Sequence, residues 1–192
     1  MIEVERKYNN LSRTTEYYIK GTYILHREDG PAQEGYDEYK AWWIDGKRHR
    51  LDGPAVEWAD DGSKIWYVNG KIHRVDGPAA IYHTGTKEWY INGRLSREDG
   101  PAVEWRDGSK QWYFDGKRHR LDGPAIEGAD GYEEWYIHGK RHRVDGPSAI
   151  YSDGMLEWCL NDYQFNTKKE WFDALTEEQK EKVLYSEYFI RG

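Results

Sequence analysis

A sixfold repeat constrains this sequence more than any other feature. The string Asp-Gly-Pro returns six times, each time preceded by an Arg two residues earlier, and in five copies a His stands directly before that Arg. The spacing from one copy to the next is 23 or 24 residues, with copies that begin at His26, His49, His73, Ser96, His119 and His142. A fixed period of this length indicates one small supersecondary unit repeated along the chain. Each His or Arg of the string therefore has equivalents at the same position in other copies, and we call such a set of equivalent residues a column.

Each copy contains two short runs that are typical of β-strands. In the second copy, residues 54–58 alternate in polarity and end at Asp60-Asp61-Gly62, and residues 64–68 follow and end at Asn69-Gly70. Asp-Gly and Asn-Gly between such runs favour type I′ turns, which require positive φ angles. We therefore expect two antiparallel strands in each repeat, with a longer connection that begins at Lys71.

The composition fits a thin structure with little core. Only 38% of the residues are hydrophobic and the mean hydropathy is −1.04, values that would otherwise suggest disorder. Aromatic residues make up 16% of the chain, however, and they bury a large area each and pair well across strands. The sequence thus predicts an all-β repeat fold, an elongated and twisted antiparallel meander of stacked β-hairpins with a short C-terminal helical cap.

We expect three segments along the chain. Residues 1–25 would form N-terminal capping strands, residues 26–160 six tandem repeats of about 23 residues, and residues 161–192 a two-helix cap. Capping boxes at Thr167 and Thr176 predict the starts of the helices. Their apolar residues are Trp171, Phe172 and Leu175, then Val183, Leu184 and Tyr188. The helices would either cover the last strand edge or dock a partner.

A period of two assigns the side chains of the strands to faces. The prediction places Trp66 and Val68 on one face together with Val56, and the residue between them on the opposite face. That opposite face would carry a column of Tyr67, Tyr90, Tyr113 and Tyr136. The tyrosines could stabilise the sheet as cross-strand pairs, or an exposed tyrosine ladder could be a recognition surface.

The arginine column admits two explanations as well. Its members are Arg50, Arg74, Arg97, Arg120 and Arg143, with an equivalent Arg27 in the first copy. Each guanidinium could bind the Asp of its own or the adjacent loop and so serve a structural role. Alternatively, the loops form a basic edge beside the tyrosine column, where phosphate would bind Arg and a base would stack on Tyr.

Several classes of function are disfavoured. Equivalent histidines in successive hairpins would lie roughly 9 to 10 Å apart, too far to share a metal ion. No catalytic motif is found, so we expect a protein that is not an enzyme and has no cofactor or metal. The net charge of −7 gives no drive towards DNA. A single cysteine, Cys159, and the lack of an apolar N-terminal segment or span favour a cytoplasmic protein.

Residues 107–119, from Asp107 to His119, carry a family resemblance. They are similar to the MORN repeat, which is a 23-residue β-hairpin unit with an aromatic strand, an Asn-Gly-Lys-type turn and a following His. The resemblance covers about residues 17–160, but MORN repeats usually continue with His-Gly-x-Gly, where this chain has Arg and Asp-Gly-Pro. Repeats with His-Arg-x-Asp-Gly-Pro-Ala also resemble uncharacterised proteins of bacteria and bacteriophages, which would imply the cytoplasm of a host.

Two functional hypotheses follow. The first is a non-enzymatic repeat scaffold that binds a protein partner along its aromatic face, for example a bacteriophage factor that inhibits a host defence protein. The second is a protein that binds and sequesters a phosphorylated small molecule such as a signalling nucleotide. Two irregular positions, Ser96 in the fourth copy and Gly128 in place of an aromatic residue in the fifth, mark either a specific site or drift. The partner and the oligomeric state stay open.

Overall fold

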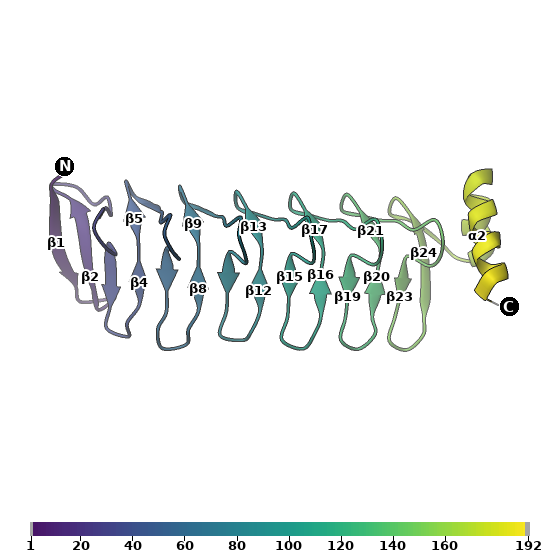
Figure 1. The fold of residues 1–192 in the computed structure, drawn as a ribbon, viewed down its shortest axis with the longest axis horizontal. Helices are drawn as coiled ribbons and strands as arrows, with labels where there is room; N and C mark the ends of the chain where they lie inside the picture. The colour runs from purple at the N-terminus through teal and green to yellow at the C-terminus, as the bar shows by residue number, and fades with distance from the viewer. Residues whose placement is uncertain (1, 191–192) are drawn as a thin grey trace. The chain divides into compact units, whose positions relative to one another are not determined.

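The structure is a computed structural model that describes residues 2–190, with side chains described as far as Tyr185. It is built of short antiparallel strands and two C-terminal helices (Figure 1). The chain divides into two compact units, Met1–Arg97 and Glu98–Gly192. Both units consist of successive β-hairpins, which confirms the predicted all-β repeat fold with a C-terminal helical cap.

In the first unit, eight strands pair with their neighbours in an antiparallel sheet. In spatial order they are β1 (Val4–Asn9), β2 (Thr14–Ile19), β3 (Gln33–Gly35), β4 (Lys40–Ala41), β7 (Val56–Glu57), β8 (Lys64–Ile65), β11 (Ala80–Ile81) and β12 (Lys87–Glu88). Spatial order follows sequence order, as expected for a meander. The strands β1 and β2 form the first hairpin, before the first Asp-Gly-Pro copy.

The second unit repeats this arrangement with seven strands. They are β15 (Val103–Glu104), β16 (Lys110–Gln111), β19 (Ile126–Glu127), β20 (Glu133–Glu134), β23 (Ala149–Ile150), β24 (Leu156–Leu160) and β25 (Tyr163–Phe165). Most of these strands have only two residues, so each contributes few backbone hydrogen bonds. Contacts outside the sheet must therefore supply much of the stability.

Between successive pairs of sheet strands the chain forms a small two-stranded hairpin, which we call an arm. The arms are β5 (Trp43–Ile44) with β6 (Lys47–Arg48), β9 (Tyr67–Val68) with β10 (Lys71–Ile72), β13 (Tyr90–Ile91) with β14 (Arg94–Leu95), β17 (Tyr113–Phe114) with β18 (Lys117–Arg118), and β21 (Tyr136–Ile137) with β22 (Lys140–Arg141). Within each unit the arms lie at one end of the sheet strands, and the turns that join the two sheet strands of each hairpin lie at the other (Figure 1).

The arms differ from the sequence prediction, in which residues 64–68 form one strand. That strand is interrupted at Trp66, whose N–H donates to the carbonyl of Ala79 at 2.8 Å while its own carbonyl accepts from His73 N–H at 3.1 Å. The chain thus changes its pairing partner at Trp66. Lys71 and Ile72, which we expected to be a connection, form a strand because they pair with the second half of the interrupted run.

The tips of the arms are the Asn-Gly turns that the sequence predicts. Asn69 and Gly70 have φ angles of 50° and 79°. Positive φ at both central residues defines a type I′ turn, whose twist matches that of the flanking strands. The same pair of positive φ angles occurs at Asp45-Gly46, Asn92-Gly93, Asp115-Gly116 and His138-Gly139. The turn prediction is therefore confirmed at the Asn-Gly and Asp-Gly arm tips, and His138-Gly139 adopts the same turn. At the sheet hairpins the type I′ prediction is wrong, because at Asp61-Gly62 and Asp107-Gly108 only the glycine has a positive φ, 77° and 94°.

One face of the sheet carries the buried apolar residues, and we call it the core face. In the first unit these residues form a cluster of Ala41, Val56, Ile65 and Ala80, and Tyr67 packs against it. Val56 pairs with Ile65, so the prediction that Val56 shares a face with Trp66 is wrong. The face assignment failed because it required the register between strands, which the period of one strand does not reveal.

The helices α1 (Lys168–Asp173) and α2 (Glu177–Ile190) begin at the predicted capping boxes. The Oγ1 of Thr167 accepts from Glu170 N–H at 3.2 Å, and the Oγ1 of Thr176 accepts from Gln179 N–H at 3.3 Å. Neither helix, as far as the structure describes the chain, has the length and apolar character needed to cross a bilayer. The side chain of Tyr188 lies outside the described residues.

The helices bury apolar side chains against the end of the second unit. Trp171, Leu175 and Val183 form a buried cluster, with Trp158 and Val144 packed against it. Trp171 is fully buried and its ring centroid lies 4.6 Å from that of Trp158. The predicted lid therefore covers the last strands.

Trp171→Ala should lower the free energy of unfolding of the second unit by about 3 to 5 kcal/mol, because it removes a large buried side chain and leaves a cavity. The matched control is Tyr163→Ala, since Tyr163 is 67% exposed. Urea denaturation followed by far-UV circular dichroism measures the difference. Equal effects of the two substitutions would contradict the packing of α1 described above.

Candidate functional site

The arginine of each copy is held by its own loop and by the preceding hairpin. The Cζ of Arg50 lies 3.9 Å from the ring centroid of Trp42. Its Nε donates to Asp52 at 2.9 Å, and its Nη1 donates to the carbonyl of Pro54 at 3.1 Å and to Glu57 at 3.0 Å. We call this arrangement an arginine rung.

The rung recurs through both units. The hydrogen bonds to Asp and to the Pro carbonyl are made by Arg27, Arg74, Arg120 and Arg143 as well. Stacking on an aromatic ring at 3.8 to 4.2 Å is found for Arg27, Arg74, Arg97, Arg120 and Arg143. The structural explanation of the column, that each Arg binds the Asp of its own loop, is confirmed.

The rung also explains the glycine of the Asp-Gly-Pro string. A Cβ at Gly53 would lie 2.9 Å from the Cζ of Arg50, and a Cβ at Gly123 would lie 2.8 Å from that of Arg120. The glycine thus permits a close approach of the guanidinium to the backbone. Each residue of the string therefore serves the arginine: Asp as an ion-pair partner, Gly as space and Pro as a carbonyl acceptor.

The guanidinium groups consequently offer little free surface to a ligand. The side chain of Arg50 is 21% exposed, whereas its partner Asp52 is 83% exposed. The hydrogen bond from Arg50 holds the pKa of Asp52 below its usual value, and Arg74 does the same for Asp76. The outer rim of the loops is therefore acidic.

The histidine before each arginine joins one arm to the next. The Nδ1 of His49 accepts a hydrogen bond from Asn69 N–H at 3.0 Å, and Gly70 N–H donates to the carbonyl of Arg48 at 2.8 Å. The same acceptor role is taken by His26, His73, His119 and His142. The histidine column is thus a set of structural acceptors.

Two of these histidines titrate at lower pH than usual. Burial lowers the pKa of His119, and the nearby His138, whose ring stacks on it at 4.3 Å, lowers it further. Burial also lowers the pKa of His142. An imidazole with both nitrogens protonated would lose its acceptor role at the turn, so the folded state favours the neutral form.

The tyrosine column lies at the start of each arm, and its members Tyr67, Tyr90, Tyr113 and Tyr136 are all half-buried. The hydroxyl of Tyr113 donates to Gln111 at 2.9 Å, and that of Tyr136 donates to Glu134 at 3.3 Å. The predicted nucleotide site required Arg and Tyr side chains side by side. The structure instead stacks the arginine column on a different set of rings, which are tryptophans for Arg50, Arg74, Arg97, Arg120 and Arg143.

Grooves lie between successive loops of the first unit. One of about 590 Å³ separates the loops that carry Arg27 and Arg50, and another of about 570 Å³ separates those of Arg50 and Arg74. The second is lined by Trp66 and Val68 and by the residues between Arg and Asp, Leu51 and Val75. Leu51 is 80% exposed and Val75 is 81% exposed. These are the loop grooves.

In the last repeat, helix α1 covers the loop that carries Arg143 and Val144. Trp158 occupies the position that holds Trp135 in the preceding repeat, but no arginine loop follows it. Trp171 of α1 packs against Trp158 instead, with the two ring planes tilted by 47°, and its Nε1 donates to the carbonyl of Arg143 at 3.1 Å. Val144, the equivalent of Leu51, packs against the same helical cluster.

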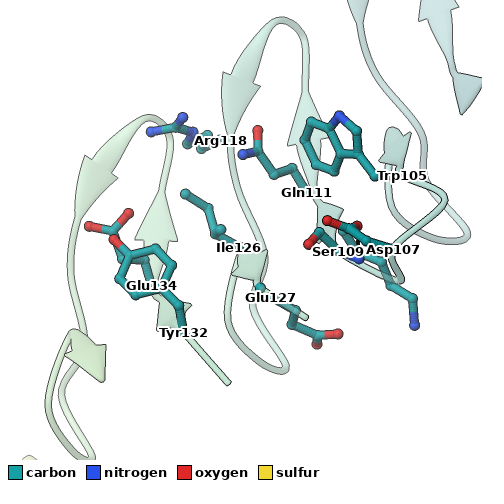
Figure 2. Close-up of a pocket in the computed structure, with 11 residues that line it drawn as sticks. Trp105, Asp107, Ser109, Gln111, Arg118, Ile126, Glu127, Tyr132 and Glu134 are labelled. Atoms are coloured by element: carbon teal, nitrogen blue, oxygen red, sulfur yellow. Dashed lines mark hydrogen bonds between the residues drawn. The ribbon is translucent and has the colours of Figure 1, made fainter. Parts of the chain in front are cut away.

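A separate hollow of about 460 Å³ opens on the core face of the second unit (Figure 2). In the fourth repeat Trp105 pairs across its hairpin with Ser109, as Trp105 N–H donates to Ser109 O. The fifth repeat reverses this order, with Gly128 on the first strand and Tyr132 on the second. The two small residues are therefore neighbours, because the pairing of β16 with β19 places Ser109 opposite Gly128.

This exchange accounts for the irregular Gly128, and the first repeat makes it too. Gly35 N–H donates to Tyr39 O, and the ring of Tyr39 lies 5.7 Å from that of Trp58. A missing aromatic residue on one strand is thus replaced by a tyrosine on its partner. In the second unit the exchange leaves the hollow between Trp105 and Tyr132 (Figure 2).

Polar side chains line one end of the hollow: Gln111, Arg118 and Glu134. Arg118 is half-buried and donates from Nε to the hydroxyl of Tyr113 at 3.3 Å. Its counterpart in the next arm, Arg141, is ion-paired with Glu157. Among the described residues, Arg118 has no such carboxylate partner. The hollow therefore contains a cation whose charge is not neutralised by an ion pair.

Sequence reasoning missed these three polar residues. They occupy positions that differ in chemistry between repeats; the equivalents of Gln111 are Ile65 and Glu88. Variation at one position of an otherwise regular repeat is the signal that could have identified them. In the part of the chain that the structure describes, no group of three or more His, Cys, Asp or Glu side chains is placed to hold a metal ion.

No protein-family model matches this chain, and no curated protein matches it. The resemblance to MORN repeats therefore stays a prediction, and the geometry alone carries the functional argument.

Arg120→Met should lower the free energy of unfolding by about 2 to 3 kcal/mol, because it removes charged hydrogen bonds and a stacked guanidinium that are partly shielded from water. Arg120→Lys should restore less than half of the loss, since an ammonium lacks the planar fork. The exposed Arg106 provides the control, and Arg106→Met should change stability by no more than about 0.5 kcal/mol. Urea titrations compare the variants, and equal losses for positions 106 and 120 would count against the rung.

The free energy of unfolding should fall as the pH is lowered from 7.5 to 5.5. The pKa values of His119 and His142 are depressed in the folded state, so the unfolded chain binds more protons below about pH 6.5. Their stabilising contribution is complete above that pH and is lost below it. Replacing both with Gln should flatten this dependence, whereas His83→Gln, at an exposed position outside the column, should leave the decrease in place. An unchanged slope in the double variant would refute this origin.

Proposed function

We propose that this chain is a non-enzymatic repeat scaffold that binds a protein partner through its loop grooves. The observation that carries the proposal is the docking of α1 at the last repeat. There the fully buried Trp171 packs against Trp158 and donates a hydrogen bond to the carbonyl of Arg143. A short helix with an aromatic anchor is therefore one occupant that this surface accepts.

Three other loops offer an equivalent apolar position without such a cover, whereas the first and fourth copies have Glu28 and Glu98 there. Val144 packs against the helical cluster, whereas Leu51 and Val75 are each at least 80% exposed, and so is Leu121 in the fifth copy at 81%. Exposed apolar side chains that flank a concave surface are typical of protein interaction sites. Burying one such side chain in a complex contributes about 1.5 to 3 kcal/mol.

The charge of the grooves indicates the chemistry of the partner. The rim carries Asp52 and Asp76, which are 83% and 76% exposed, whereas the arginines beneath them are engaged in their rungs. The covering helix α1 is matched to such a surface, because Lys168 and Lys169 precede its Trp171. We therefore expect a partner helix that combines an aromatic anchor with lysine or arginine.

The second hypothesis, phosphate binding by the arginine column, receives less support. Arg50 and Arg120 each donate to two carboxylates and a carbonyl, and each stacks on a tryptophan. A phosphate would have to displace these groups. A bacteriophage origin, a host defence protein as the partner and a cytoplasmic location rest on the sequence and its resemblances, and they stay predictions.

A peptide of residues 166–185 is the probe for this proposal, because it contains the one helix seen on an equivalent surface. Labelled peptide should bind the whole chain saturably in fluorescence anisotropy. The double variant Leu51→Asp with Val75→Asp should weaken binding about tenfold or more, as expected from losing a buried leucine. A Trp171→Ala peptide should bind less well for the same reason.

Leu11→Asp is the control for added charge, since Leu11 is 99% exposed and lies outside the grooves. It should leave the affinity of the peptide unchanged. Failure of the peptide to bind, or equal weakening by the Leu11 control and the groove variant, would refute the loop grooves as the docking surface.

A further inference from the structure

The hollow on the core face is a second site, independent of the loop grooves. Its walls are Trp105 and Tyr132, and its floor includes Ser109, Gly128 and Ile126. In the first unit Trp58 and Tyr82 are separated by the single small residue Ser63 on the strand between them. Here two small residues follow one another, so the walls lie three strand spacings apart, about 14 Å.

That separation leaves the faces of both rings accessible to a flat group. Figure 2 shows Trp105 on one side of Ile126 and Tyr132 on the other, and both rings line the hollow. A planar ring stacked on an aromatic side chain gains about 1 to 3 kcal/mol when the ligand is a nucleic-acid base. The apolar part of the hollow therefore suits a heteroaromatic ring.

The polar end of the hollow presents both donors and an acceptor. Gln111 accepts from Tyr113 through its Oε1, which leaves its amide nitrogen as a donor, and Arg118 supplies further N–H groups. Glu134 is a buried carboxylate, 7% exposed, that accepts from Tyr136 and has the Nε of Arg141 3.6 Å from its Oε1; a carboxylate has about four acceptor sites, so these partners do not use all of them. This set is complementary to an edge that carries both a carbonyl and N–H groups.

Guanine has such an edge. Its O6 accepts hydrogen bonds, as in its frequent pairing with arginine, while its N1–H and N2–H₂ donate. A carboxylate that accepts from N1–H and N2–H₂, beside donors directed at O6, would distinguish guanine from adenine, whose edge reverses this order.

The rim of the hollow carries one lysine, Lys110, and two carboxylates, Asp107 and Glu127. Glu127 is bound by Arg120 at 2.6 Å and Asp107 accepts from Ser109 N–H at 2.9 Å, so both carboxylates already have partners. Lys110 is exposed and lines the same hollow. A single phosphate group could therefore bind at Lys110 while the ring lies inside.

We propose that this hollow binds a guanine nucleotide, with the base stacked on Trp105 or Tyr132 and its edge hydrogen-bonded by Glu134, Arg118 and Gln111. The volume of about 460 Å³ is within the range of small-molecule sites. The overall charge of −7 opposes a long nucleic acid, so a free nucleotide is the ligand that we assign.

Isothermal titration with GMP, AMP, CMP and UMP tests this assignment on the whole chain. GMP should bind with one site per chain and more tightly than the other three nucleotides. Arg118→Met should weaken GMP binding about tenfold or more, because a charged donor to the base is lost. The matched control is Arg48→Met, since Arg48 holds the same position in an arm of the first unit.

A second variant guards against misfolding. Gln111→Met changes no charge, and thermal unfolding of each variant shows whether the fold is kept. Equal loss of binding in the Arg48 and Arg118 variants, equal affinity for all four nucleotides, or the same heat from inorganic phosphate alone would each overturn the proposal. Binding of a guanosine-containing single-stranded RNA but not of GMP would overturn the free nucleotide as the ligand. The peptide experiment on the loop grooves is unaffected by any of these results.

Discussion

The arginine rung is the interaction on which the rest of this structure depends. The sheet strands are mostly two residues long and the buried apolar side chains are dominated by alanine, so apolar burial and strand pairing are both modest. A stacked and hydrogen-bonded guanidinium supplies directional contacts in their place. Because Arg50 touches Trp42 of the preceding hairpin and Asp52 of its own loop, it ties the loop of one repeat to the hairpin before it. The Asp-Gly-Pro string supplies that arginine with an ion-pair partner, with space beside the backbone and with a carbonyl acceptor.

Features that depend on neighbours in the sequence were predictable. The type I′ turns need positive φ at two adjacent residues, and only a few residue types accept that conformation, so Asn69-Gly70 marks an arm tip directly. The pairing of Arg50 with Asp52 likewise joins residues two apart. The capping box of Thr176 with Gln179 follows the same logic. In each of these three cases the partners lie within a few residues of each other, so the local backbone geometry determines the structure.

Features that depend on register were not predictable. The strand changes partner at Trp66, which splits one expected strand into two, and no local signal marks the change. The hydrogen bond from Asn69 to His49 joins residues 20 apart, and it is visible only once successive arms are placed side by side. The same holds for the hollow, because Gly128 and Ser109 become neighbours only through the pairing of β16 with β19.

A regular repeat satisfies its own polar groups and therefore leaves little chemistry for ligands. The arginines of the rungs and the histidine acceptors are engaged by contacts within the repeats, so the columns that attract notice in the sequence offer little free surface. Besides the loop grooves between regular repeats, surface for ligands is found where the pattern is broken. The loss of a seventh loop exposes Trp158 to a helix, and the exchange of Gly128 with Tyr132 opens a gap between two rings. In a protein of this kind, departures from the consensus are a guide to function, because they leave contacts that the repeat itself does not make.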